Sequence, residues 1–237
     1  SRNDYAVPDE SVVNEVYTLL NFNTITNTII MKKILNASFG CLLALCLLGG
    51  GTFSPAQAET VQKKESFQVG KQAFLLNGKP FIIKAAEIHY PRIPEPYWEH
   101  RILLCKALGM NTICLYVFWN LHETEPDQFD FSGNKDIAKF CRLAQKHGMY
   151  VIVRPGPYVC AEWEMGGLPW WLLKKKDVQL RTLDTYYMSR VEKFMKEVGK
   201  QLSGQQITKG GNIIMVQVEN EYGSYATDKP YVSAIRD

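Results

Sequence analysis

Between residues 81 and 218 the sequence alternates apolar segments of strand length with amphipathic segments of helix length, and this alternation constrains the fold most. Continuous apolar runs fit buried strands, whereas apolar residues spaced three and four apart fit one face of a helix. The strands are expected at residues 81–89, 112–119, 150–154 and 213–218, and the helices at residues 94–108, 134–147 and from Asp184 onward. Such an alternation predicts a parallel sheet that helices cover on both faces.

Two α/β architectures fit this pattern. Four strands with their helices are half of a (β/α)8 TIM barrel, which takes about 250 residues when complete. A doubly wound open sheet is the alternative, but the first strand is not followed by the glycine-rich phosphate loop that often accompanies such sheets. We therefore expect an α/β chain in which about the first four βα units of a TIM barrel are present, within residues 59–237.

The helices have expected boundaries and inward faces. Asp184 is expected to cap the last helix, and Gly109 and Gly148 to end the first two. The apolar faces are Trp98, Ile102, Cys105 and Leu108 in the first helix, Ile137, Phe140, Cys141 and Ala144 in the second, and Tyr187, Val191, Phe194, Val198 and Leu202 in the third. Before the first strand, Asn77-Gly78 predicts a hairpin turn, and the hairpin is expected to cover the bottom of the barrel.

A short charged and apolar segment near the N-terminus has the pattern of a secretory signal. Met31 is followed by two lysines, an apolar run over residues 34–48 and an Ala-Gln-Ala cleavage pattern at residues 56–58. A membrane anchor is the alternative, but the run is shorter than the ~20 residues that span a bilayer. We expect residues 31–58 to be a signal peptide, residues 1–30 to be an upstream non-native segment, and the mature protein to be secreted or periplasmic without a stable membrane span.

Composition excludes several function classes. The formal net charge of the 237 residues is +3, without the concentrated basic patch of nucleic-acid-binding proteins. None of the six cysteines forms a C-x-x-C pair, and no histidine spacing resembles a zinc site. We therefore expect no nucleic-acid partner, no metal, no cofactor and no obligatory disulfide.

Polar and aromatic residues gather where each expected strand ends, which in a barrel is one rim around one pocket. Glutamates, amides and aromatic rings in such a place suit a carbohydrate, and glycoside hydrolysis requires two carboxyl groups, one of them held protonated. The residues are Glu87, His89, Tyr90, Arg92 and Trp98 after the first strand, Tyr116, Trp119, Asn120, His122 and Glu123 after the second, Arg154, Tyr158, Glu162, Trp163 and Glu164 after the third, and Asn220, Glu221 and Tyr222 after the fourth.

Four stretches of this rim resemble glycoside hydrolase family 35, the β-galactosidase family. They are AEIHYPR at residues 86–92, YVFWNLHE at residues 116–123, RPGPYVCAEWEMGGLP at residues 154–169 and VQVENEYGSY at residues 216–225. The resemblance runs from about Phe67 to the last residue. It implies a retaining β-galactosidase that hydrolyses terminal non-reducing β-D-galactose residues from glycans.

The resemblance also implies a role for particular residues. Glu221 matches the proton donor, and Asn220 matches the amide that contacts the 2-hydroxyl of the sugar. The remaining positions match the galactose-binding subsite and its loop: Tyr116, Cys160, Ala161 and Glu162. Glu219 is the alternative proton donor, because strand alternation would put it on the same side as Glu221. Glu162 could instead form an ion pair with Arg154, and His89 and His122 are expected to be structural hydrogen-bonding groups.

The family's nucleophile, a second glutamate near the end of the seventh strand, matches no position here. A retaining mechanism needs its two carboxyl groups roughly 5–5.5 Å apart. We therefore expect this chain to be a fragment of a longer enzyme and inactive in isolation. The alternatives are another exo-β-glycosidase on the same barrel, such as a β-glucosaminidase, and a non-catalytic carbohydrate-binding barrel.

Overall fold

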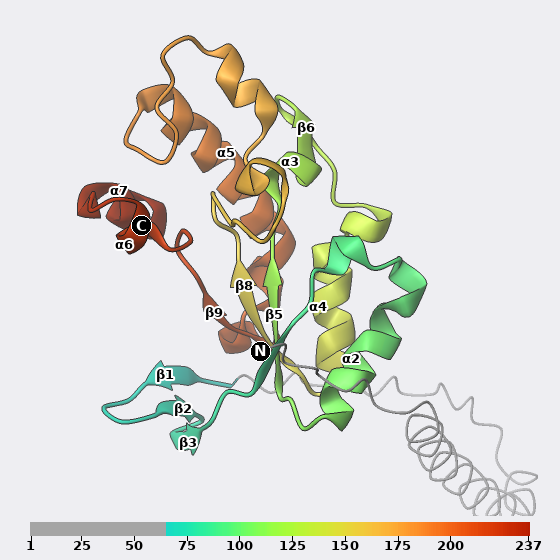
Figure 1. Ribbon diagram of the computed structural model, residues 1–237. Coiled ribbons are helices and arrows are strands. Elements are labelled where there is room, and N and C mark those ends of the chain that lie inside the picture. Colours follow the sequence, from blue (N-terminus) through green and yellow to red (C-terminus); the bar gives the residue numbers. More distant parts are fainter. Residues whose placement is uncertain (1–64) are drawn as a thin grey trace, which may run out of the picture. The chain divides into compact units, whose positions relative to one another are not determined.

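The computed structural model describes residues 65–237, which fold around a four-stranded parallel sheet (Figure 1). Its strands are β4 (Ala85–Glu87), β5 (Thr112–Tyr116), β8 (Tyr150–Arg154) and β9 (Ile213–Val216), in the order β4-β5-β8-β9. The parallel sheet is therefore confirmed, and its strands follow chain order without the reversal of a doubly wound sheet. The expected upstream segment and signal peptide lie outside the described residues.

Helices connect the strands of this sheet. They are α2 (Trp98–Ala107), α4 (Ile137–Lys146) and α5 (Thr185–Leu202), and Figure 1 shows α2 and α4 side by side next to the sheet. The predicted inward faces of α4 and α5 are confirmed, since every one of those residues is buried. Asp136 and Asp184 cap α4 and α5 by accepting hydrogen bonds from Lys139 N at 2.7 Å and Tyr187 N at 2.8 Å, which satisfies backbone donors that a helix leaves free.

The first helix differs from its prediction. A 3₁₀ turn (Glu95–Tyr97) precedes α2, with Pro94 as its N-terminal boundary and Pro96 within it, so the α-helix begins four residues later than predicted. Trp98 and Ile102 are fully buried as predicted, but Leu108 is 68% exposed. The cause lies in the sheet, since β4 is an edge strand of only three residues and offers little surface to the last turn of α2.

Several strand boundaries were also predicted too long. The residues expected to form one strand over 81–89 divide between β3 (Lys79–Phe81) and β4. The strand expected over 112–119 ends at Tyr116, and Trp119 begins a short helix, α3 (Trp119–His122). The strand expected over 213–218 ends at Val216, which is 60% exposed. A short antiparallel pair, β6 (Glu123–Glu125) and β7 (Gln128–Phe129), follows α3.

An antiparallel meander lies where the strands of the sheet begin (Figure 1). It consists of β1 (Phe67–Val69), β2 (Phe74–Leu76) and β3, and the predicted turn has φ of 52° at Asn77 and 76° at Gly78. Phe81 packs edge-on against Tyr150, the first residue of β8, with 5.4 Å between the ring centroids. The hairpin prediction is confirmed, and the meander contacts the amino end of a central strand.

Candidate active site

Arg154 connects the carboxyl ends of all four parallel strands. It is the last residue of the central strand β8 and lies in register with Tyr116, the last residue of β5. One guanidinium nitrogen contacts the Tyr116 hydroxyl and lies 3.4 Å from Oε2 of Glu87, which ends β4. The other donates to Oδ1 of Asn220, beyond β9, at 2.6 Å. The parallel sheet thus gathers three other predicted rim residues around the Arg154 cation.

Burial sets the protonation state of Tyr116. The side chain is 6% exposed, and the Arg154 guanidinium carbon lies 4.1 Å from the centre of its ring. Desolvation raises the pKa of Tyr116 to about 12, although the positive charge of Arg154 acts to lower it. The carboxylate of Glu87, which hydrogen-bonds the phenol, raises the pKa further. A tyrosine phenol is neutral near pH 7 in any case, and the raised pKa keeps Tyr116 neutral well above that pH, so it can donate a hydrogen bond.

A second chain of contacts runs from Glu87 to the loop after β8. Oε1 of Glu87 lies 2.8 Å from Nε2 of His89, and Nδ1 of His89 lies 3.1 Å from a guanidinium nitrogen of Arg92. Because an arginine can only donate, Nδ1 accepts and Nε2 carries the proton that points at Glu87. Arg92 donates its other nitrogen to the carbonyls of Ala161 at 3.1 Å and Glu162 at 2.7 Å.

The loop that Arg92 holds has a rare backbone conformation. The backbone φ angles of Cys160, Ala161 and Glu162 are 59°, 56° and 45°. Three consecutive left-handed residues are rare when none of them is glycine. The loop continues into Trp163, whose ring lies 5.0 Å from the Arg92 guanidinium and 4.0 Å from the stacked ring of Phe118. Ala161 is buried and Glu162 exposed.

Glu219 and Glu221 have opposite environments. Glu219 is 2% exposed; its oxygens accept from Arg181 at 2.8 Å, from the Tyr231 hydroxyl at 2.5 Å and from its neighbour's backbone N–H at 3.0 Å. Glu221 is exposed and forms the N-terminal boundary of α6 (Tyr222–Tyr225). The expectation that both lie on one side is wrong, because strand geometry ends at Val216 and both glutamates have positive φ, 58° and 49°.

The structure buries five of the predicted rim residues in the core instead of the pocket: Tyr90, Trp98, Trp119, His122 and Glu123 are all fully buried. Glu123 is fully buried, where it accepts from the Trp119 indole at 2.6 Å and pairs with Arg190 of α5. His122 is also fully buried and hydrogen-bonds the Tyr90 hydroxyl at 2.6 Å, as its expected structural role requires. The alternative ion pair between Glu162 and Arg154 does not occur within residues 65–237, where Arg154 has the partners described above.

No sequence pattern pointed to Arg181 or Tyr231. Arg181 lies in the loop before α5 and Tyr231 in the helix α7 (Lys229–Arg236), and both are buried against Glu219. Burial, together with Tyr187 and Glu219, raises the pKa of Tyr231 far above its ordinary value, so its phenol remains a donor to the Glu219 carboxylate.

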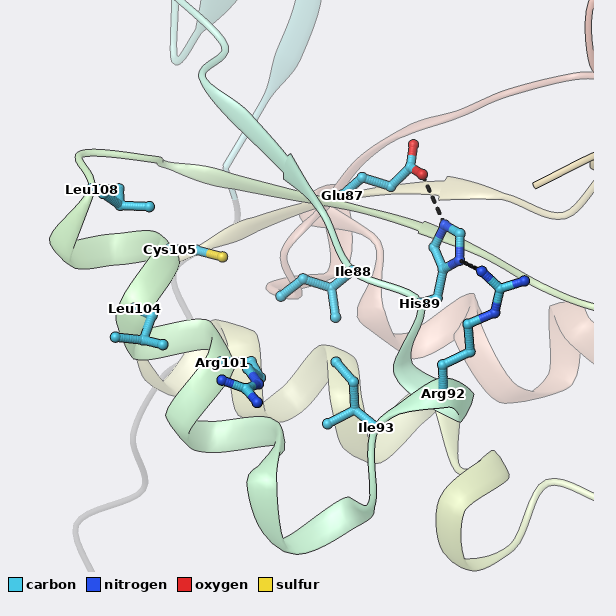
Figure 2. Close-up of a pocket in the computed structure, with 9 residues that line it drawn as sticks. All are labelled: Glu87, Ile88, His89, Arg92, Ile93, Arg101, Leu104, Cys105 and Leu108. Carbon is cyan, nitrogen blue, oxygen red and sulfur yellow. Dashed lines mark hydrogen bonds and ion pairs between the residues drawn. The ribbon is translucent and has the colours of Figure 1, made fainter. Parts of the chain in front are cut away.

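A separate hollow of about 530 Å³ lies between β4 and α2 (Figure 2). Figure 2 shows the Glu87–His89–Arg92 chain along one side and Arg101, Leu104, Cys105 and Leu108 of α2 and its end along the other. It does not include Tyr116, Asn220 or Glu221, so it is distinct from the predicted sugar site. Over the described part of the chain there is no cluster of three potential metal ligands, and no helix has the length and apolarity to cross a membrane.

Known proteins share both the sequence and the fold. Residues 73–237 match the model of a family described as glycosyl hydrolases family 35. A β-galactosidase from Xanthomonas manihotis is 45% identical over 179 residues, which cover 76% of this chain and 30% of that protein. A β-galactosidase from Homo sapiens is 44% identical over 192 residues, which cover 81% of this chain and 28% of that protein. The chain thus spans less than a third of the length of these relatives.

Solved structures resemble the chain at low sequence identity. An exo-β-1,4-mannosidase from Opitutaceae bacterium strain TAV5 has a TM-score of 0.51 and 19% identity, covering 67% of this chain and 30% of that one. A GH5_18 structure from Bifidobacterium longum subsp. longum has a TM-score of 0.50 and 15% identity, covering 65% of this chain and 39% of that one. With the parallel sheet, these likenesses show a TIM-barrel-like glycosidase fold, and the family match over residues 73–237 shows that this chain belongs to glycosyl hydrolases family 35.

Proposed function

We propose that this chain supplies the acid/base half of a retaining β-galactosidase that removes terminal β-D-galactose from the non-reducing ends of glycans. The observation that carries the proposal is the convergence on Arg154, which brings Tyr116 together with Asn220, the residue before the exposed Glu221. The relatives named β-galactosidase support the choice of galactose. In this proposal the full-length enzyme closes the sheet into a (β/α)8 barrel, and residues 31–58 direct it to secretion or the periplasm.

Glu221 is the proposed proton donor to the leaving oxygen, and it then acts as the base that activates water. Its exposure leaves the carboxyl accessible to a substrate, whereas both oxygens of the competing Glu219 are engaged in buried contacts. Asn220 presents its amide to the sugar in a defined orientation. Because Arg154 takes Oδ1, the NH2 group of Asn220 is the part left to donate to the 2-hydroxyl.

The galactose itself is held, in this proposal, by Tyr116 and by the loop of Cys160, Ala161 and Glu162. Tyr116 offers a neutral phenol, and the left-handed loop offers backbone groups and an exposed carboxylate in fixed positions. The nucleophile is assigned to no residue of this chain. It belongs, in the proposal, to the part of the relatives' length that this chain does not span.

The test is hydrolysis of aryl β-galactosides by the protein at its full natural length, with Glu221→Gln as the variant. General acid–base catalysis contributes about 10²- to 10⁴-fold, so kcat/KM for phenyl β-galactoside is expected to fall by that factor. Glu192→Gln, which changes an exposed glutamate on α5, serves as the control. The proposal fails if Glu221→Gln keeps full activity, or if β-glucosides or N-acetyl-β-glucosaminides are cleaved in preference to β-galactosides. Release of galactose with an inverted anomeric centre would refute the retaining mechanism.

A further inference from the structure

Arg181 forms hydrogen bonds with the chain on both sides of Glu221. Its guanidinium pairs with the Glu219 carboxylate at 2.8 Å and donates to the carbonyl oxygen of Asn220 at 2.7 Å. The carbonyl oxygen of Arg181 itself accepts from the Tyr222 hydroxyl at 2.9 Å. Three of the four residues from 219 to 222 therefore bond to this arginine, and the one that does not is the exposed Glu221.

Aromatic rings hold the Arg181 guanidinium in place. Its carbon atom lies 4.1 Å from the ring centres of both Tyr158 and Tyr225, and 5.4 Å from that of Tyr222. Arg181 is only 6% exposed. A planar cation that is stacked, ion-paired and buried has little freedom, so the atoms that it bonds are fixed with it.

The segment that Arg181 holds needs support from outside. Glu219 and Glu221 both have left-handed backbone angles, which cost conformational free energy for residues with a Cβ atom. Local bonds contribute, since Glu219 N donates to the Gly156 carbonyl at 2.9 Å and Gln217 Nε2 donates to the Glu219 carbonyl at 2.9 Å. Asn220 N also donates to Oε2 of Glu219 at 3.0 Å, and Ala226 N donates to the Tyr222 carbonyl at 2.7 Å. Arg181 adds bonds to both neighbours of Glu221 from a loop about 40 positions earlier, through the Asn220 carbonyl and the Tyr222 hydroxyl.

We propose that Arg181 is the positioning residue of the proton donor: it fixes the segment from Glu219 to Tyr222, including the left-handed Glu219 and Glu221, so that Glu221 meets the leaving oxygen. The inference rests on the proposed function, because it gives Glu221 that role. A proton donor must lie within hydrogen-bond reach of its acceptor, and a misplacement of 1 Å can cost about 10²-fold in rate. Arg181 touches neither the sugar nor the reacting atoms in this scheme and acts only through the backbone around Glu221.

The test compares two substrates whose leaving groups differ in their need for a proton. Phenyl β-galactoside requires protonation of the departing oxygen, whereas the dinitrophenolate of dinitrophenyl β-galactoside leaves without it. In the full-length enzyme, Arg181→Lys keeps the charge but loses the planar fork and the double stack. We expect kcat/KM for the phenyl substrate to fall about 10²-fold and that for the dinitrophenyl substrate to fall at least tenfold less.

Arg190→Lys is the matched control. Arg190 is another buried arginine with a glutamate partner, Glu123, and it lies 4.9 Å from the ring of Trp171. Its replacement is expected to lower the stability of the protein and to lower kcat/KM for both substrates by the same factor. If Arg181→Lys does the same, the residue is merely structural and the proposal is overturned.

Two further variants complete the test. Adding Arg181→Lys to Glu221→Gln should cause no further loss on the phenyl substrate, since the donor is already absent; a multiplied loss would overturn the proposal. Glu221→Gln alone tests the proposed function. If it lowers kcat/KM equally for both substrates, Glu221 is not the donor and both proposals fail.

If Arg181→Lys does not fold, Tyr225→Ala is the substitute variant. It removes one of the rings stacked on Arg181, and this ring is 59% exposed. We expect a loss of several-fold confined to the phenyl substrate, and an equal loss on both would refute the inference.

Discussion

His122 is buried as a neutral imidazole, which should make the stability of this protein fall in mild acid. Its Nδ1 lies 2.8 Å from the carbonyl oxygen of Asp130, and its Nε2 lies 2.6 Å from the Tyr90 hydroxyl. The carbonyl can only accept, so Nδ1 carries the proton and Nε2 accepts from Tyr90. The ring also stacks on Phe131 at 4.4 Å between centroids. A second ring proton on Nε2 would force the Tyr90 hydroxyl to accept instead of donate, and the hydroxyl proton would lose its present acceptor.

The magnitude follows from the pKa. Burial lowers the pKa of His122 from 6.5 to about 4, and the nearby Lys135 charge acts in the same direction, against the hydrogen bond and charge of Asp130. Between these two pH values His122 is protonated in the unfolded chain but remains neutral in the folded protein. The stabilisation is therefore complete above pH 6.5 and is lost as the pH falls toward 4. It amounts to about 3 kcal/mol, a large share of the 5–15 kcal/mol that stabilise a typical domain.

Urea denaturation of the 237-residue chain between pH 7 and pH 4 measures this loss. His122→Gln keeps an acceptor for Tyr90 but cannot be protonated, so its free energy of unfolding should start lower at pH 7 and decline by about 3 kcal/mol less than the wild type. His147→Gln is the control, because His147 is a surface partner of Glu99 and its loss leaves the His122 contribution intact. Asp130, whose hydrogen bonds to Ser132 lower its pKa to about 2, acts only below pH 3.8.

The reasoning is refuted if the wild type and His122→Gln lose the same free energy of unfolding between pH 7 and pH 4. A parallel decline would mean that the folded protein accommodates the imidazolium. The hydrogen bonds to Tyr90 and Asp130 would then not hold the ring neutral.

Two other substitutions give sharp expectations. Glu219→Gln leaves the Arg181 cation buried without its charged partner and should lower the free energy of unfolding by about 3–5 kcal/mol. Glu221→Gln changes an exposed residue and should change the free energy of unfolding by no more than about 0.5 kcal/mol. Equal effects in urea denaturation would contradict the environments described for the two glutamates. Tyr116→Phe removes a hydroxyl bonded to Arg154 and, in the proposed function, to galactose. The sugar hydroxyl is neutral, and losing a hydrogen bond between neutral groups costs about 0.5–1.5 kcal/mol, or roughly two- to tenfold in kcat/KM. Unchanged kinetics would remove Tyr116 from the sugar site.

The sequence predicted those parts of the fold that local periodicity encodes. The apolar faces of α4 and α5 and the Asp184 cap are short-range patterns, and the structure has them as expected. Element ends were less accurate because they depend on partners: Leu108 fits an apolar helix face, yet β4 is too short to cover it. Trp119 continues an apolar run and nevertheless begins a helix.

The candidate site was predicted as a gathering of residues but not as a set of contacts. Parallel strands bring their carboxyl ends together, so Glu87, Tyr116 and Arg154 could be expected near one another. Which glutamate is buried could not be read in the same way. Strand alternation does not apply to Glu219 and Glu221, because both have left-handed angles. They lie in a segment bonded to Arg181, an arginine about 40 positions earlier in a loop without a pattern.

The place of Arg154 at the junction of the strand ends also bears on how the specificity of the proposed β-galactosidase could evolve. Substitutions at Glu87, Tyr116 and Asn220 share one guanidinium, so each alters the electrostatic setting of the other two. Mutational effects at these positions should be strongly epistatic. Directed evolution toward another sugar would then advance through coordinated changes at several strand ends, while single-site libraries at any one of them would yield mostly inactive variants.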